Sequence, residues 1–237
     1  MAVENCLLAA LSHELYQTLT PHLKQISLKQ GEILHQPGDI IKDIYFPIDC
    51  IISITITMND GSTTETAMVG KRELAGINAF FGVSETTQTE YIVQVAGKAI
   101  KANAQALREE FERNKELRDL ILRYTQVLIA QTSQTAGCNR LHPLEQRLAR
   151  WLLEVQDRVD SDDLKLTQDF TADMLGVRRA GVTQAAQKLQ EEGIIQYSRG
   201  LIQILDQQKL EKTSCECFRT LKNEHERLLG RKQKNCF

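Results

Sequence analysis

The sequence lacks the features that mark membrane-spanning and exported proteins. No apolar stretch approaches the roughly 18 residues that a membrane-spanning helix needs. The first residues, MAVENCLLAALSHELY, contain neither a basic segment nor a small-residue cleavage site, so we expect no signal peptide. These absences predict a cytoplasmic protein with no membrane partner.

The usual signatures of enzymes are also missing. The chain has no Ser/His/Asp set, no phosphate loop of the Walker type and no HExxH pair. Its carboxylates are scattered and do not define a site. We therefore expect no enzymatic activity and assign no catalytic residue.

Cysteines and histidines are few and dispersed. Cys215 and Cys217 lie two positions apart, but no second pair occurs at the spacing typical of metal ligands. We expect structural or incidental thiols and no metal site. The residues concerned are Cys6, Cys50, Cys138, Cys215, Cys217, Cys236, His13, His22, His35, His142 and His225.

Positive charge is not in excess, since 29 Lys and Arg stand against 31 Asp and Glu. The two halves differ, however. Residues 139–237 carry 17 basic and 15 acidic residues, a net charge of +2, whereas residues 1–138 carry 12 and 16, a net charge of −4. Nucleic-acid binding would thus depend on a local basic patch in the C-terminal half.

The segment from residue 166 to 205 predicts a winged helix-turn-helix. Thr167 suits the N-cap of a first helix, and Gly176 suits the tight turn that follows it. A second helix places Val182, Ala185, Ala186 and Leu189 on its inner side and ends at Gly193. Two β-prone runs, 194–197 and 201–205, then form a hairpin around Ser198-Arg199-Gly200.

The start of the second helix has the chemistry of a DNA-reading surface. Arg178 and Arg179 offer planar forks of donors that suit guanine or phosphate, and Gln184 can pair with adenine. The small residues Ala180 and Gly181 would allow a close approach to DNA. The complete set of DNA-binding candidates is Thr167, Arg178, Arg179, Ala180, Gln184 and Arg199. The alternative is a helical hairpin with solvated arginines.

The N-terminal half predicts a β-sandwich or barrel-like roll followed by a long helix. Short β-prone runs occur at 25–29, 32–35, 43–47, 51–58, 63–69, 91–95 and 98–102, separated by glycine turns. From about residue 104 to 140 the pattern becomes helical. Its apolar stripe predicts a coiled-coil dimer seam, with packing on the chain's own β domain as the alternative. The seam residues are Leu117, Leu120, Ile121, Tyr124 and Leu128.

This order of elements resembles the CRP/FNR family of bacterial transcription regulators. The resemblance rests on KQGEILHQPGD (29–39) and NDGSTTETAMVGKRELAG (59–76) in the roll, and on NRLHPLEQRLARWLL (139–153) and residues 166–195 beyond it. It implies an α+β fold with an N-terminal cyclic-nucleotide-binding-type β-roll (jelly roll), a long dimerisation helix and a C-terminal winged helix-turn-helix. The implied boundaries are 1–110, 111–138 and 139–237.

The resemblance places the effector pocket at Arg72, Glu73, Thr89 and Glu90, where the chain departs from the family pattern. Cyclic-nucleotide binders carry a Gly-Glu pair and then an Arg-Ser or Arg-Thr pair that neutralises the phosphate. Here Arg72-Glu73 replaces the first pair, and Thr89 and Glu90 replace the second. Cyclic AMP is therefore not expected as the effector, and the effector remains unknown.

Two further comparisons follow from the resemblance. Oxygen-sensing members carry clustered N-terminal cysteines, whereas this half has only Cys6 and Cys50, so we expect no iron–sulfur cluster. The family's base-reading positions fall on Arg179, Ala180 and Gln184. Only Arg179 keeps the residue type of the best-known member, which predicts a different operator sequence.

The sequence thus predicts a homodimeric, DNA-binding transcription regulator acting on a palindromic double-stranded operator. The alternatives are a regulator that needs no effector and a binding module whose roll contacts other proteins. Activation would also need a surface that touches RNA polymerase, and no motif identifies one.

Overall fold

The computed structural model describes residues 4–82, 85–198 and 200–230. The chain divides into two compact units that do not follow its order. The first contains residues 1–54, 68–129 and 225–237, and the second contains residues 55–67 and 130–224. The boundaries 1–110, 111–138 and 139–237 remain a prediction.

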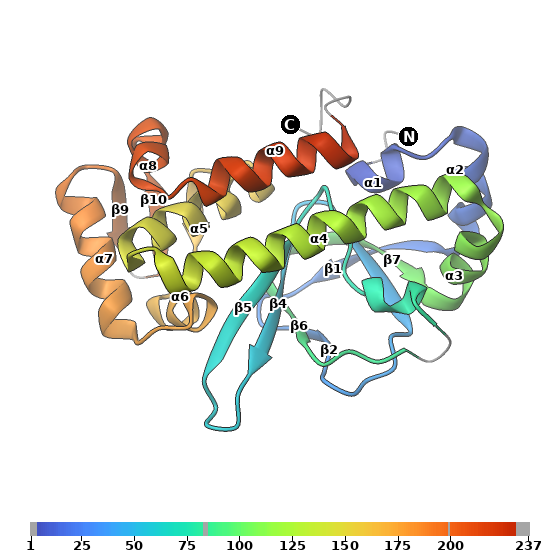
Figure 1. The fold of residues 1–237 in the computed structure, drawn as a ribbon, viewed down its shortest axis with the longest axis horizontal. Helices are drawn as coiled ribbons and strands as arrows, with labels where there is room; N and C mark the ends of the chain where they lie inside the picture. The colour runs from blue at the N-terminus through green and yellow to red at the C-terminus, as the bar shows by residue number, and fades with distance from the viewer. Residues whose placement is uncertain (1–3, 83–84, 199, 231–237) are drawn as a thin grey trace. The chain divides into compact units, whose positions relative to one another are not determined.

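Short antiparallel strands form the roll, as the glycine-separated runs predict (Figure 1). One sheet has the order β1-β7-β3, with Ile26 opposite Ala99 and Phe46 opposite Ile100. The other has the order β2-β6-β4-β5. The strands are β1 Leu23–Leu28, β2 Ile33–His35, β3 Asp43–Pro47, β4 Ile51–Thr57, β5 Thr63–Val69, β6 Glu90–Val95 and β7 Gly97–Asn103.

Short helices precede and interrupt these strands. The side chain of Asn5 accepts hydrogen bonds from the N–H groups of Leu7 and Leu8 and so caps the first helix. The helices are α1 Cys6–Ala9, α2 His13–Leu19 and the 3₁₀ turns η1 Thr20–His22 and η2 Ile77–Phe80.

The predicted long helix is broken into α3 Ala104–Arg113 and α4 Lys115–Leu141. Asn114 has extended backbone angles, and its side chain accepts hydrogen bonds from the N–H groups of Glu116 and Leu117. Asn114 therefore ends one helix and caps the next. Of the helices that the structure describes, none is both long and apolar enough to cross a membrane.

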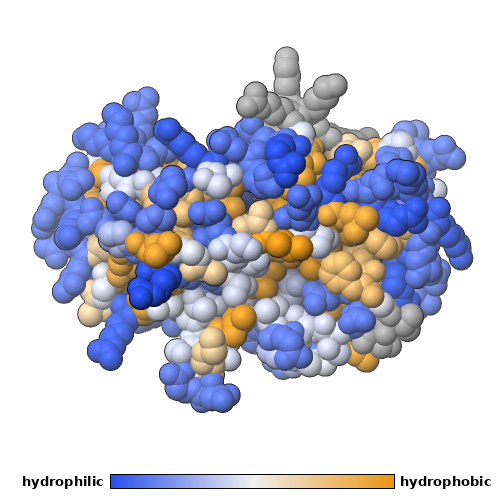
Figure 2. Space-filling model, in the orientation of Figure 1, coloured by the Kyte–Doolittle hydropathy of each residue, from blue (hydrophilic) through white to orange (hydrophobic). Residues whose placement is uncertain are grey.

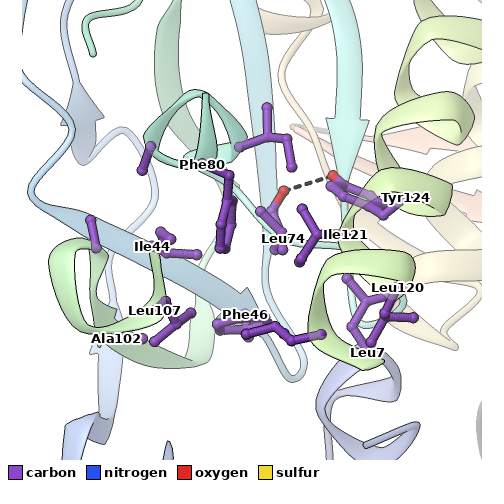
Figure 3. Close-up of a cluster of buried hydrophobic side chains, with 14 of the residues drawn as sticks. Leu7, Ile44, Phe46, Leu74, Phe80, Ala102, Leu107, Leu120, Ile121 and Tyr124 are labelled. Carbon is purple, nitrogen blue, oxygen red and sulfur yellow. Dashed lines mark hydrogen bonds between the residues drawn. The ribbon is translucent and has the colours of Figure 1, made fainter. Parts of the chain in front are cut away.

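The predicted dimer seam is wrong. Leu117, Leu120, Ile121 and Tyr124 are only 3, 5, 1 and 1% exposed, and Leu128 is partly buried beside them. They pack into a core with Ile44, Phe46, Leu74 and Phe80 of the same unit (Figure 3). The alternative of packing on the chain's own roll is correct, because the apolar stripe fills the hydrophobic face of that roll.

The second unit holds the helix-turn-helix and a small sheet of order β8-β10-β9. The helix over residues 207–229 is interrupted at residues 214–216. The elements are α5 Leu144–Val159, β8 Asp163–Lys165, α6 Gln168–Leu175, α7 Arg179–Glu191, β9 Ile195–Ser198, β10 Leu201–Ile204, α8 Gln207–Thr213 and α9 Cys217–Leu229.

Candidate nucleic-acid interface

Helix α6 begins and ends where its sequence predicts. The Thr167 hydroxyl accepts a 3.2 Å hydrogen bond from the N–H of Phe170 and caps the helix. Gly176 ends it in the left-handed conformation, with φ of 61°. Because this φ strains other residues, Gly176 allows the sharp turn into α7.

Helix α7 buries the inner face that its periodicity predicts, namely Val182, Ala185, Ala186 and Leu189. Gly181 lies where α7 packs on α5. A Cβ atom at this position would lie 3.0 Å from the side chain of Leu144 in α5. Gly181 therefore allows the close packing of α7 on α5, and its proposed part in an approach to DNA stays a prediction.

The opposite face of α7 is exposed and polar. Arg178, Arg179, Ala180 and Gln184 are all exposed, as a DNA-reading surface requires. Arg178 is the N-cap residue and Arg179 the first residue of the helix. Thr183 and Gln187 are also exposed but were not predicted from the sequence. The four-residue spacing from Arg179 through Thr183 to Gln187 would have found both.

Polar residues of α6 hold the side chain of Arg179. Its guanidinium lies 3.3 Å from the Asp169 carboxylate and donates a 3.4 Å hydrogen bond to Gln168 Oε1. The Thr183 hydroxyl donates to the same oxygen at 2.9 Å. The ion pair is largely exposed, with side chains 64 and 69% accessible. An exposed pair contributes only about 0–1 kcal/mol, so Arg179 is oriented but easily released.

The hairpin of β9 and β10 lies close to the start of α6. Ser198 pairs with Leu201 across its turn, and Gly200 has φ of 82°. A Cβ atom on Gly200 would lie 3.6 Å from the side chain of Thr167. Thr167 and the hairpin turn are therefore neighbours on one surface. Arg199, the predicted basic tip, lies outside the described residues.

Residues 55–67 of the β4–β5 hairpin, which we call the hairpin tip, belong to the second unit and contact its helices. Thr64 donates a 3.5 Å hydrogen bond to the carbonyl oxygen of Met174 in α6. The indole N–H of Trp151 in α5 donates to the buried carboxylate of Glu65 at 2.9 Å.

A cavity of about 480 Å³ lies beside these contacts. Arg178 and Arg147 both line it. Burial lowers the pKa of Arg147, and its guanidinium donates to the carbonyl oxygen of Leu175. Arg178 thus borders both this cavity and the exposed face of α7. The other lining residues are Met58, Ser62, Thr63, Thr64, Asn139, Asp173, Leu175, Gly176 and Val177.

The residues predicted for the effector pocket differ in environment. Arg72 and Glu73 are buried, and the Glu73 carboxylate accepts a hydrogen bond from the N–H of Gly70. Thr89 and Glu90 are half-buried. The hydroxyls of Thr89 and Thr87 are 2.7 Å apart and form a hydrogen bond. The effector pocket remains a prediction.

Comparison with known proteins supports this interpretation of the second unit. The family model of the Crp-like helix-turn-helix domain matches residues 146–213. No curated protein matches the chain by sequence.

Solved structures match the fold over most of the chain. FixK2 from Bradyrhizobium japonicum is 14% identical with a TM-score of 0.70, over 81% of this chain and 98% of FixK2. The c-di-GMP-responsive global regulator CLP from Xanthomonas campestris is 15% identical with a TM-score of 0.68, over 82 and 100%. A CRP/FNR-family regulator from Thermus thermophilus is 20% identical with a TM-score of 0.65, over 81 and 98%.

The expected α+β architecture is confirmed by these matches, and the helix-turn-helix by the family model. The chain thus carries a Crp-like helix-turn-helix domain within the fold of the CRP/FNR family of transcription regulators.

Proposed function

We propose that the protein is a homodimeric, sequence-specific transcription regulator controlled through its β-roll. The main support is the exposed polar face of α7. The exposed face of α7 presents Arg178, Arg179 and Gln184, while its other face is buried in a Crp-like helix-turn-helix domain. In such domains the N-terminal part of the second helix contacts base edges in the major groove.

The contacts around Arg179 suit a base-reading role. Asp169 and Gln168 orient its guanidinium without burying it. When DNA approaches, phosphate repels the Asp169 carboxylate and attracts the arginine, so the exposed ion pair is exchanged for a bidentate contact with guanine. Thr167 and the neighbouring hairpin turn would contact the phosphate backbone and so fix the position of α7 in the groove.

The outer face of α4 is the proposed dimer surface, in place of the residues that the sequence analysis chose. Leu122 and Ile129 lie seven positions apart and are 50 and 60% exposed. Hydrophobic side chains appear along the course of α4 in Figure 2. A seven-residue apolar spacing is that of a two-stranded coiled coil, so Leu122 and Ile129 would meet their counterparts in a second copy.

The resemblance of the roll to ligand-binding rolls supports control by an effector. The relative CLP is described as responsive to c-di-GMP, so a nucleotide is a reasonable first class of ligand to test. For cyclic AMP we expect no effect, because Thr89 and Glu90 stand where the family's cationic pair would bind the phosphate.

Selection of bound sites from random double-stranded DNA by the purified full chain tests the proposal. We expect an inverted repeat whose half-sites lie about 34 Å apart, one turn of DNA. Affinity should fall steeply with salt concentration. Parallel selections with cell metabolites, cyclic AMP and c-di-GMP test effector control. Failure to enrich any sequence would contradict the proposal and favour the binding module with a protein-interaction roll.

A further inference from the structure

Four metal-ligating side chains converge in the second unit, and none of them belongs to α7. Cys138 lies near the end of α4, and His142 lies in the connection to α5. Cys215 and Cys217 lie at the junction of α8 and α9. Their ligand atoms all lie within 4.8 Å of one another. The expectation of no metal site is thereby revised, since the four ligands come from separate parts of the chain and form no motif in the sequence.

The distances fit a tetrahedral ion. With zinc–sulfur bonds of about 2.3 Å and zinc–nitrogen bonds of about 2.0–2.1 Å, neighbouring ligand atoms of a tetrahedron are roughly 3.5–3.8 Å apart. The sulfurs of Cys138 and Cys215 are 3.6 Å apart. The Cys217 sulfur and His142 Nδ1 are also 3.6 Å apart. The sulfur–sulfur distance exceeds a disulfide bond by far, and both distances match edges of that tetrahedron.

The groups around the four ligands are those of a metal site. The Nε2 atom of His142 lies 3.3 Å from the Glu216 carboxylate. This contact orients the ring and leaves Nδ1 directed to Cys217, as in carboxylate–histidine–zinc arrangements. The side-chain amide of Gln134 donates a 3.0 Å hydrogen bond to the Cys217 sulfur. Such a donor favours the thiolate, which is the form that binds metal.

The local charge also suits a metal–thiolate centre. Zinc with three thiolates and one neutral histidine carries a net charge of −1. The buried guanidiniums of Arg147 and Arg150 interact electrostatically with Cys138. Arg150 is also paired with Glu154 at 2.7 Å. The three sulfurs themselves are buried. Because Glu154 already balances Arg150, the positive charge of Arg147 is the one that offsets part of the cost of placing an anion there.

We propose that Cys138, His142, Cys215 and Cys217 bind one zinc ion in a structural Cys₃His site. Three thiolates and an imidazole satisfy all four positions of tetrahedral zinc, which leaves no open position for catalysis. Zinc binding displaces the thiol protons of the three cysteines. The ion would fasten the α8–α9 junction to the end of α4 and thereby stabilise the unit that contains α7.

Metal analysis of the purified full chain tests the site directly. We expect one zinc per chain, retained after dialysis against metal-free buffer. The variants Cys138→Ser and Cys215→Ser should each lose the metal. Cys50→Ser, which alters a buried thiol outside the four-residue cluster, should retain it. Wild-type protein without zinc, with iron in its place, or with a Cys138–Cys215 disulfide in the presence of reductant would overturn the proposal.

Variants that keep four metal ligands distinguish loss of the metal from failure to fold. His142→Cys should keep one metal per chain and, with Co²⁺ as the probe, give stronger sulfur-to-cobalt absorption than wild type. Glu216→Gln leaves every ligand in place and should weaken metal affinity about 10- to 100-fold, measured by competition with a coloured chelator. An octahedral Co²⁺ spectrum, or unchanged affinity in both Glu216→Gln and His142→Ala, would overturn the assignment.

Discussion

The hydroxyl of Tyr124 donates a 2.6 Å hydrogen bond to the backbone carbonyl oxygen of Leu74 (Figure 3). Both residues are buried. The bond gives the buried Leu74 carbonyl a donor and ties α4 to the segment after β5. A residue of the expected dimer seam is thus part of the roll's own core.

Replacement of Tyr124 by Phe tests the strength of this tie. The variant keeps the ring but leaves the Leu74 carbonyl without this donor, which should lower the free energy of unfolding by roughly 1–3 kcal/mol. Tyr91→Phe is the comparison, because its hydroxyl makes a longer 3.4 Å bond to a side chain. Chemical denaturation measures both. An equal or larger loss in Tyr91→Phe would contradict the expected order.

The double variant Leu122→Glu, Ile129→Glu should give folded monomers. Both side chains are exposed, so the introduced charges should disrupt a seam between two copies without disturbing the core of the roll. Leu120→Glu should instead unfold the roll, because its side chain is in the core. Sedimentation and circular dichroism separate the two effects. Leu141→Glu, at another exposed position of α4, is the control and should stay dimeric; a dimeric double variant would place the seam elsewhere.

Arg179→Ala should weaken binding to the selected operator by about 1–3 kcal/mol and relax preference at one base pair per half-site. The cause is the loss of a bidentate contact to guanine. Arg219→Ala provides a matched control, since it removes an arginine that is 73% exposed on α9. Titration of labelled operators with single base changes measures both. Wild-type sequence preference in Arg179→Ala would show that another residue reads the base.

Acid should destabilise the protein through His35. This residue is 5% exposed and packs edge-on against Tyr45 and Tyr91. Burial lowers its pKa from the usual 6.5, although Asp43 and Asp39 oppose the shift. Between the folded and unfolded pKa values the unfolded chain binds more protons. The free energy of unfolding should therefore fall as pH decreases through 6.5 toward the folded pKa.

The variant His35→Phe keeps an aromatic ring and removes the proton-binding group. It should lose less stability than wild type between about pH 7.5 and pH 5.5, measured by chemical denaturation. His13→Gln changes an exposed histidine of the same unit and should behave as wild type. If the free energy of unfolding fell equally with pH in wild type and His35→Phe, other groups would cause the acid sensitivity.

Local features were predictable because they depend on neighbours in the chain. The cap at Thr167, the turn at Gly176 and the buried face of α7 follow from spacing and backbone preference alone. The apolar stripe of α4 was equally clear, but an apolar stripe does not specify its partner. The sequence pattern therefore could not distinguish the roll's core from a second copy.

The convergence of Cys138, His142, Cys215 and Cys217 was out of reach for a different reason. Metal motifs are visible in a sequence when ligands recur at short intervals. Here about seventy residues of helix-turn-helix separate the first two ligands from the last two. Only tertiary structure brings them together.

The placement of residues 55–67 in the unit of the helix-turn-helix limits how this protein can be divided or recombined. A fragment from Ala130 onward would leave the Trp151 indole without its acceptor Glu65, and the Met174 carbonyl without Thr64. Exchange of DNA-binding specificity with a relative must therefore transfer the β4–β5 hairpin tip as well. Residues far apart in the chain thus form one structural block.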